Sequence, residues 1–304
     1  MIKPKHLCPL LLATVAIVPA AGQDSKPSPA LDHVTIAVSD LGAAEMFFRD
    51  ALGFSIKEGR LHENTIDNRH IKFGDGSALE LITAEEPVDE LARWYLDFLE
   101  HGDGAAFLSL TGSAIADVGT ALTAAGYDYR LTAGESVSAL ATPPGDSLYN
   151  LFFVETHDRA PDLPEHLEHA NHAIRLKAVW WAAGGRRTLP QFMEHFAVQA
   201  CGTLELPFPP STVELFQLER GEIYLVDREA YHARSPVLGV TVEVPSLTDA
   251  AAALSPTVRS AALVGQSTRG RSLILPPSAA YGIFLEFLEP TPVEQRRDPV
   301  CGDS

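Results

Sequence analysis

Apolar and polar residues alternate near the start of the chain, in the segment LDHVTIAVSDLGAAEMFFRDALGF (31–54). Its first residues repeat with a period of two, which is typical of a β-strand with two different faces. Ser39 and Asp40 then form a helix N-cap signal, and apolar residues recur at helical spacing up to Gly53. The segment therefore predicts a strand followed by an amphipathic helix.

The same pattern recurs along the chain. Short strand candidates follow the helix, among them 68–75 and 77–83, and we interpret the first copy as a βαβββ unit. Related patterns occupy residues 105–155, 175–227 and 235–289, and the second copy is the least regular. Repetition of one supersecondary unit indicates an architecture built from repeated modules. The predicted fold class is therefore α+β, with four βαβββ modules that form two pairs.

Composition agrees with a globular protein and narrows the partners. The chain has 304 residues, of which 46% are hydrophobic and 21% charged, and its net charge is −17. Such an acidic surface repels phosphate backbones, so nucleic acid is not an expected partner. A strongly anionic ligand would need a local basic pocket.

The first 23 residues have the features of a signal peptide. A short basic start with Lys3 and Lys5 precedes an apolar run at 7–19, which is short for a bilayer span. We expect cleavage, a periplasmic or secreted protein, and no membrane association afterwards; an uncleaved N-terminal anchor is the alternative. Residues 24–30 are then expected to be a disordered lead-in.

The pattern also predicts the domain organisation. The expected divisions are a first module pair at 31–157, a linker at 158–173, a second module pair at 174–290 and a flexible tail at 291–304. After signal cleavage two cysteines remain, Cys201 and Cys301, and they could pair in an oxidising compartment. The sequence does not decide whether they do.

Several of these segments carry a family resemblance. The opening 31–54 and the strands NRHIKFGDGSALELI (68–82) resemble the first module of the vicinal oxygen chelate superfamily, which includes glyoxalase I, extradiol dioxygenases and bleomycin-resistance proteins. HANHAIRL (169–176) and RSLILPPSAAYGIFLEF (271–287) resemble segments of its glyoxalase-like branch. The resemblance extends over roughly residues 31–290.

The resemblance implies a fold and a cofactor. In this superfamily, paired βαβββ modules form half-open mixed β-barrels with helices outside, and a divalent metal lies in the concavity. The first strand of a module supplies His or Gln to the metal, and the last strand supplies Glu. Such ligands suit Zn, Ni, Mn or Fe, which would polarise vicinal oxygens of a small-molecule substrate.

Module one has both ligand types at the matching positions. His33 lies on the same face of its strand as Thr35, and Glu80 lies between two leucines. A charged residue inside an apolar strand is costly to bury unless it is paired or metal-bound. We therefore interpret His33 and Glu80 as metal ligands and Glu80 also as a catalytic residue. The alternatives are a hydrogen-bonded core histidine and a carboxylate paired with Arg69 or Lys72.

The other modules lack complete ligand sets. Module four has Glu286 in its last strand but Gly239 in its first. The equivalent residues are Ala106 and about Phe153 in module two, and Ala178 and about Tyr224 in module three. If modules one and two share a barrel, only His33 and Glu80 face its concavity. If modules one and four share a barrel, Glu286 completes a His/carboxylate triad as a third ligand and a second catalytic carboxylate.

Further polar and aromatic residues are candidates for the site. His172 is a candidate metal ligand in the linker, and a solvated, histidine-rich turn is the alternative for this segment. The expected substrate-binding residues are Asn68, His70, His169, Asn171 and Trp180. Asn68 and His70 would share one strand face, which lines either a pocket or a sheet edge. Trp180 is either a core residue or a stacking wall.

The chain lacks nucleotide-binding loops, the G-x-S-x-G elbow and the HExxH motif. The leading functional hypothesis is therefore an exported, metal-dependent lyase, isomerase or dioxygenase that acts on a small, oxygen-rich metabolite. The alternative is a metal-free protein of the same fold that binds or sequesters a small molecule. The protein is expected to be a monomer or a homodimer.

Overall fold

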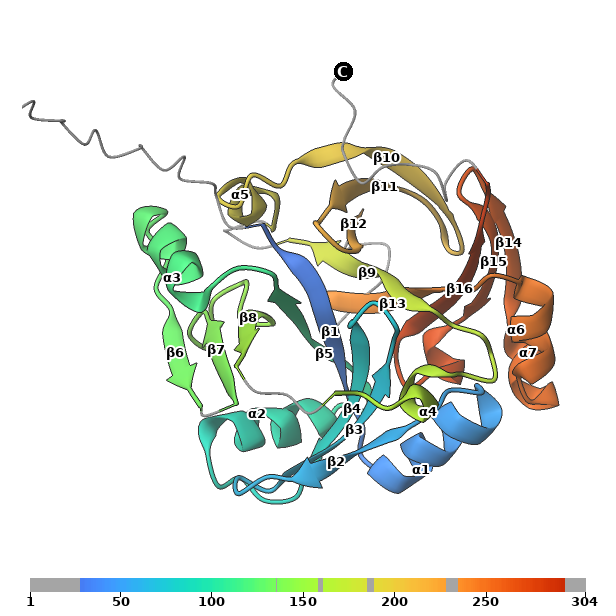
Figure 1. Ribbon diagram of the computed structural model, residues 1–304, viewed down its shortest axis with the longest axis horizontal. Helices are drawn as coiled ribbons and strands as arrows, with labels where there is room; N and C mark the ends of the chain where they lie inside the picture. Colours follow the sequence, from blue (N-terminus) through green and yellow to red (C-terminus); the bar gives the residue numbers. More distant parts are fainter. Residues whose placement is uncertain (1–27, 135, 158–160, 185–188, 228–234, 293–304) are drawn as a thin grey trace, which may run out of the picture.

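The computed structural model describes residues 28–134, 136–157, 161–184, 189–227 and 235–292 (Figure 1). The predicted signal peptide and most of the predicted tail, with Cys301, lie outside these residues. No described helix is long and apolar enough to cross a membrane. The described chain contains two mixed β-sheets of eight strands each together with helices, as predicted for an α+β protein of repeated modules.

Modules one and two form the first sheet, in the strand order β2-β3-β4-β1-β5-β8-β7-β6. Its strands are β1 (Ala30–Ala37), β2 (Lys57–Leu61), β3 (Ile66–Lys72), β4 (Ala78–Ala84), β5 (Gly104–Thr111), β6 (Arg130–Ala133), β7 (Val137–Ala141) and β8 (Leu151–Thr156). In each module the first strand is parallel to the last, and β1 and β5 join the two modules as antiparallel neighbours.

Modules three and four form the second sheet in the same way, in the order β10-β11-β12-β9-β13-β16-β15-β14. Its strands are β9 (Arg175–Ala183), β10 (Ala200–Pro207), β11 (Pro210–Gln217), β12 (Glu222–Asp227), β13 (Val237–Glu243), β14 (Leu263–Ser267), β15 (Gly270–Leu275) and β16 (Phe284–Pro290). Module one is thus paired with module two, so the arrangement of modules one and four in one barrel is not the observed one.

Helices connect these strands. They are α1 (Leu41–Met46) with its π-helical continuation η1 (Phe47–Ala51), α2 (Glu90–Leu99), α3 (Ile115–Ala124), α4 (Pro164–Leu167), α5 (Leu189–Glu194), α6 (Leu247–Ala253), α7 (Pro256–Ala261) and the 3-10 turn η3 (Pro277–Ala279). Of these, α2 packs on the concave face of the first sheet. The predicted cap of α1 is present, because the Asp40 side chain accepts a hydrogen bond from the Ala43 backbone N–H.

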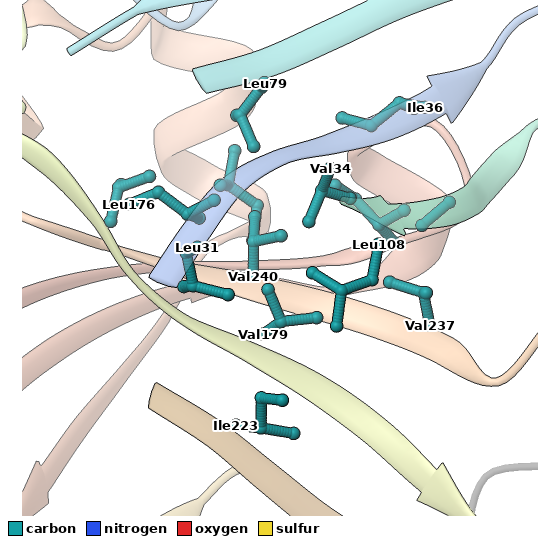
Figure 2. Close-up of a cluster of buried hydrophobic side chains, with 14 of the residues drawn as sticks. Leu31, Val34, Ile36, Leu79, Leu108, Leu176, Val179, Ile223, Val237 and Val240 are labelled. Carbon is teal, nitrogen blue, oxygen red and sulfur yellow. The ribbon is translucent and has the colours of Figure 1, made fainter. Parts of the chain in front are cut away.

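The alternation of side chains along β1 separates a core face from a polar face. Val34 and Ile36 are fully buried and belong to a hydrophobic core that both sheets share. Figure 2 shows Leu108 of the first sheet gathered with Val179 and Val240 of the second. The two sheets therefore pack against each other through one face each, and their opposite, concave faces take no part in this contact.

The concave faces of the two sheets differ. Inside the second sheet lies an apolar cluster centred on the fully buried Trp180. The outer strands of this sheet also meet, because a Cβ atom on Gly265 of β14 would lie 2.4 Å from Pro207 of β10. Glycine is therefore required at this contact. The second sheet is nearly closed and filled, whereas the first sheet keeps a cavity.

We expect Leu108→Ala to reduce the free energy of unfolding by about 2–5 kcal/mol, because it leaves a void in the core between the sheets. Denaturant unfolding should show both halves lost in one transition, since this core belongs to both. The control is Leu61→Ala, at a leucine that is 59% exposed and should change stability by less than about 0.5 kcal/mol. Independent loss of one half would contradict a shared core.

Candidate functional site

The concave face of the first sheet encloses a cavity of about 690 Å³. Its base is formed by β1, β3 and β4, its sides by β2, β7 and β8, and α2 contributes Leu91 and Tyr95. Polar residues at or near the base are Asp32, His33, Asn68, His70 and Glu80. This volume is in the range of small-molecule sites.

Glu80 is the buried carboxylate at the centre of this base. Its Oε1 accepts a hydrogen bond from Asn68 Nδ2 at 2.6 Å, and its Oε2 lies 3.3 Å from His33 Nε2. Burial raises the pKa of Glu80, but His33 and the Asn68 hydrogen bond outweigh it and lower this pKa to about 2. Arg69, by contrast, points to the other face of β3 and pairs with Glu45 and Asp67. Glu80 is therefore an ionised carboxylate that faces the cavity.

His33 lies between two carboxylates. Its Nδ1 is 2.5 Å from Asp32 Oδ2, and its Nε2 faces Glu80. Burial lowers the pKa of His33, but the hydrogen bonds and charges of Asp32 and Glu80 raise it to about 9. The side chain is therefore an imidazolium at neutral pH, and both of its ring nitrogens are in use.

Asp32 was not predicted as a site residue, because neighbours in a regular strand point to opposite faces. The β1–β5 register shifts between Leu31 and His33, so a β-bulge lies at Asp32. A bulge re-aims a side chain, and here it brings the carboxylate to His33. Sequence periodicity contains no signal for this irregularity.

His70 occupies the place that alternation predicts, on the same face as Asn68 and opposite Glu80 in the β3–β4 register. Its Nδ1 lies 3.9 Å from Glu80 Oε1. Burial lowers the pKa of His70 to about 4, so this imidazole is neutral. The base of the cavity thus combines one imidazolium, one neutral imidazole and one carboxylate.

Module two contributes an apolar wall in place of ligands. Phe152 packs its ring edge-on to His33, with ring centroids 5.7 Å apart, and Val154 of the same strand also lines the cavity. The expected position at about Phe153 is off by one residue: Phe153 points into the shared core and contacts Phe196. The apolar character expected of module two is nevertheless found.

The linker residues lie away from the cavity. His169 accepts a hydrogen bond from the Ser55 N–H at Nδ1 and contacts the Lys72 carbonyl at Nε2, each at 3.0 Å. Asn171 donates to the Leu52 carbonyl at 2.8 Å. His172 is exposed, with a φ of 57°. The side chains of His169 and Asn171 join the linker to module one, and none of the three residues lines the cavity.

Glu286 and Trp180 lie inside the second sheet, not beside His33. Glu286 is 1% exposed and accepts hydrogen bonds from Thr241 at 2.6 Å and Ser272 at 2.5 Å. The Trp180 indole donates to Thr241 and stacks on Phe284. Since the sheet pairing separates Glu286 from Glu80, the predicted His/carboxylate triad does not form. Both residues complete a filled interior.

The polar side chains at the base of the cavity supply only some of the ligands that a divalent metal needs. His33 and Glu80 present two facing donors, and His70 lies nearest as a third group. Within the described part of the chain, however, no three His, Cys, Asp or Glu side chains are grouped as ligands for one ion. Catalytic metal centres of the zinc type generally use three protein ligands. The residues present therefore fit only part of a metal centre.

Comparison with known families agrees with this architecture. Residues 31–196 match the family described as a glyoxalase-like domain. The chain belongs to this glyoxalase-like family. The fold is that of the vicinal oxygen chelate superfamily, as the opening strand, helix and closing strand of module one predicted. No curated protein matches the chain closely enough in sequence to count as a relative.

Solved structures share the fold at low sequence identity. A mutant of 4-hydroxymandelate synthase from Streptomyces coelicolor superposes with a TM-score of 0.61 at 13% identity, over 87% of this chain and 93% of that one. A hypothetical protein from Staphylococcus aureus gives 0.57 at 11% identity, over 85% and 98%. A xylose isomerase-like TIM barrel/4-hydroxyphenylpyruvate dioxygenase fusion protein gives 0.56 at 12%, over 88% and 50%. These likenesses establish the glyoxalase-like fold.

The His33–Glu80 pair predicts how stability depends on pH. Because the pKa of His33 is raised from 6.5 to about 9, its stabilisation is complete below pH 6.5 and is lost as the pH rises through 9. Because the pKa of Glu80 is lowered from 4.5 to about 2, its stabilisation is lost as the pH falls through that range. Unfolding of metal-free protein should thus show a loss on the order of 2 kcal/mol between pH 6.5 and 9.

The matched variant is His33→Gln, which should remove the alkaline loss of stability because His70, the imidazole that then remains beside Glu80, has a pKa lowered to about 4. The control is His101→Gln, at an exposed histidine just after the C-terminal end of α2 that does not line the cavity, which should keep it. An unchanged alkaline limb in His33→Gln would show that another group is responsible.

Proposed function

We propose that the protein binds a small, oxygen-rich organic molecule in the cavity of the first sheet. The observation that carries this proposal is the contrast between two equivalent carboxylates. Glu80 and Glu286 occupy matching places, opposite Thr35 and Thr241 in their sheets. Glu286 is sealed in a filled interior, whereas Glu80 opens into a cavity with its charge intact. A charge that folding keeps at a cavity base is suited to a ligand.

The polar base offers both kinds of hydrogen-bonding group. The His33 imidazolium can donate to a carbonyl or hydroxyl oxygen, and the Glu80 carboxylate can accept from a ligand hydroxyl. Asn68 fixes one carboxylate oxygen, and Asp32 fixes the orientation of the imidazole. Since these groups are already oriented, ligand binding would cost little free energy for ordering them.

The electrostatics favour binding over proton transfer. An efficient general acid or base has a pKa close to the working pH. The pKa of His33 is about 9 and that of Glu80 about 2, so at neutral pH neither group readily exchanges its proton. The pair is better suited to hold and polarise a ligand oxygen. This supports the alternative of a metal-free binding protein, which the incomplete ligand sets favour.

A metal-dependent enzyme is the second candidate, and one observation favours it. Asp32 binds Nδ1 of His33, while Nε2 faces Glu80 Oε2 at 3.3 Å. Around bound metals, a ligating histidine commonly donates one ring N–H to a carboxylate and turns its other nitrogen to the ion. Asp32 and His33 have the first half of this arrangement, and Glu80 would be a second ligand. Lyase, isomerase or dioxygenase chemistry at Glu80 stays a prediction of the family resemblance. Export to the periplasm or medium, and a monomeric or homodimeric state, are likewise proposals.

Thermal shift with a panel of small hydroxy acids, keto acids and sugars tests the binding proposal. A ligand at 100 times its Kd adds about 2.7 kcal/mol, which corresponds to roughly 5 °C in Tm for a chain of this size. We expect Glu80→Gln to abolish the shift. The control is Glu286→Gln, which alters the equivalent carboxylate outside the cavity and should keep it. A panel without hits, or hits that survive Glu80→Gln, would contradict the proposal.

Metal removal separates the two candidates. We expect purified protein to contain less than one equivalent of Zn, Ni, Mn or Fe, and chelation to leave Tm and ligand shifts unchanged, because the described donor set is incomplete. Metal content and Tm are measured before and after chelation and re-addition of each ion. A stoichiometric ion that is lost in Glu80→Gln would instead favour the metal-dependent enzyme.

A further inference from the structure

The cavity has chemically different sides. Its base carries the polar residues around Glu80, while module two supplies Val137, Ala139, Phe152 and Val154 on one side. Leu91 and Val137 are 39% and 43% exposed, so apolar surface continues outward from the cavity. Apolar walls of this kind give binding energy to the carbon skeleton of a ligand. A purely polar ligand would leave this wall unused.

On another side, β2 brings Arg60 to the cavity through a β-bulge. The β2–β3 register shifts between Glu58 and Leu61, so Gly59 and Arg60 lie in the irregular part of the strand. The backbone N–H of Arg60 donates to Asn68 Oδ1 at 2.9 Å. A Cβ atom on Gly59 would lie only 2.0 Å from this same oxygen, so the arrangement requires glycine there. Bulges next to functional sites serve to re-aim a side chain.

Asn68 therefore links two parts of the cavity. Its carbonyl oxygen holds the Arg60 backbone, and its amide group holds Glu80 Oε1 at 2.6 Å. The buried Asn68 side chain thus fixes the position of the Arg60 backbone relative to the polar base. The charge of Arg60 also reaches the cavity, because burial and the Arg60 charge together lower the pKa of the neighbouring His62.

Arg60 has no ion-pair partner among the residues that the structure describes. Within the described residues, its guanidinium has no carboxylate within 4.0 Å, whereas Lys57, on the same strand, is bound to Asp162 at 2.5 Å. The chain as a whole has a net charge of −17, which disfavours anions in general. Arg60 is exposed and lines the cavity, where the bulge holds its backbone. Its positive charge offsets that repulsion locally, and its guanidinium offers planar, bidentate donors to an anionic group.

We propose that Arg60 determines ligand specificity by binding the anionic group of an organic anion. The apolar body of this ligand would lie against the wall formed by Phe152 and Val154. The inference deepens the proposed function, because it names the class of small molecule that the same cavity takes. The ligand would extend from Arg60 across the cavity, with its apolar part toward β7 and β8 and its oxygen atoms near the polar base.

Two fluorescent dyes that differ by one charge test this assignment. 8-Anilinonaphthalene-1-sulfonate carries a sulfonate, and N-phenyl-1-naphthylamine is the same aromatic skeleton without it. We expect Arg60→Gln to weaken binding of the sulfonate dye by about tenfold and of the neutral dye by less than about twofold, since only the first loses a charge-assisted hydrogen bond. The control is Arg93→Gln, at an exposed arginine of α2 that does not line the cavity.

The variant Phe152→Ala completes the experiment, because it should weaken both dyes alike through loss of the apolar wall. Far-UV circular dichroism confirms that each variant is folded. Equal effects of Arg60→Gln on the two dyes, or an equal effect of Arg93→Gln on the sulfonate dye, would overturn the role of Arg60 while leaving the cavity as a binding site. Failure of wild-type protein to bind either dye would overturn an apolar-bodied ligand, and the metabolite panel would still decide the proposed function.

Discussion

The packing of the two sheets against each other is the constraint on which the other features depend. Val34 and Ile36 of β1 must enter the shared core, and β-strand alternation then turns His33 and Thr35 to the concave side. The same rule buries Leu79 and Leu81 and turns Glu80 toward the cavity. A slip of one residue would place the carboxylate in the apolar core, so the hydrophobic contact between the sheets also fixes the register of the polar site.

The two halves of the molecule show what happens to a buried carboxylate under two different conditions. In the second sheet, Glu286 receives two hydroxyl hydrogen bonds and is surrounded by Trp180 and other large side chains, so its interactions are complete within the fold. In the first sheet, Glu80 receives its stabilisation from Asn68 and His33 but keeps an open side. A carboxylate that is buried except on one side lowers the stability of the fold unless water or a ligand contacts that open side. Such carboxylates are therefore candidates for functional sites.

The fold and half of the candidate site could be predicted from the sequence, because both follow from regular periodicity. Alternation in 31–38 and the repeated βαβββ pattern indicated the modules, and the inward positions of His33, Asn68, His70 and Glu80 followed from the same alternation. The pairing of modules could not be predicted, because all four modules present similar apolar faces. For that reason the sequence alone allows Glu286 as a partner of His33, whereas in the structure the two residues belong to different sheets. The linker also contains the clustered polar residues His169, Asn171 and His172, but the side chains of the first two bind backbone groups of module one and the third is exposed.

The residues that sequence patterns missed share one physical cause. Asp32 and Arg60 both lie where the strand register shifts, and a bulge places a side chain on a face that the two-residue period assigns to its neighbour. One bulge sets a carboxylate behind His33, and the other holds the backbone of Arg60 against Asn68 at the cavity. Irregular backbone is costly in a sheet, because it interrupts the hydrogen-bond ladder and here also requires Gly59. That two such irregularities converge on the open cavity of the first sheet, with Asn68 and Glu80 between them, argues that this concave face is shaped for a ligand and not only for folding.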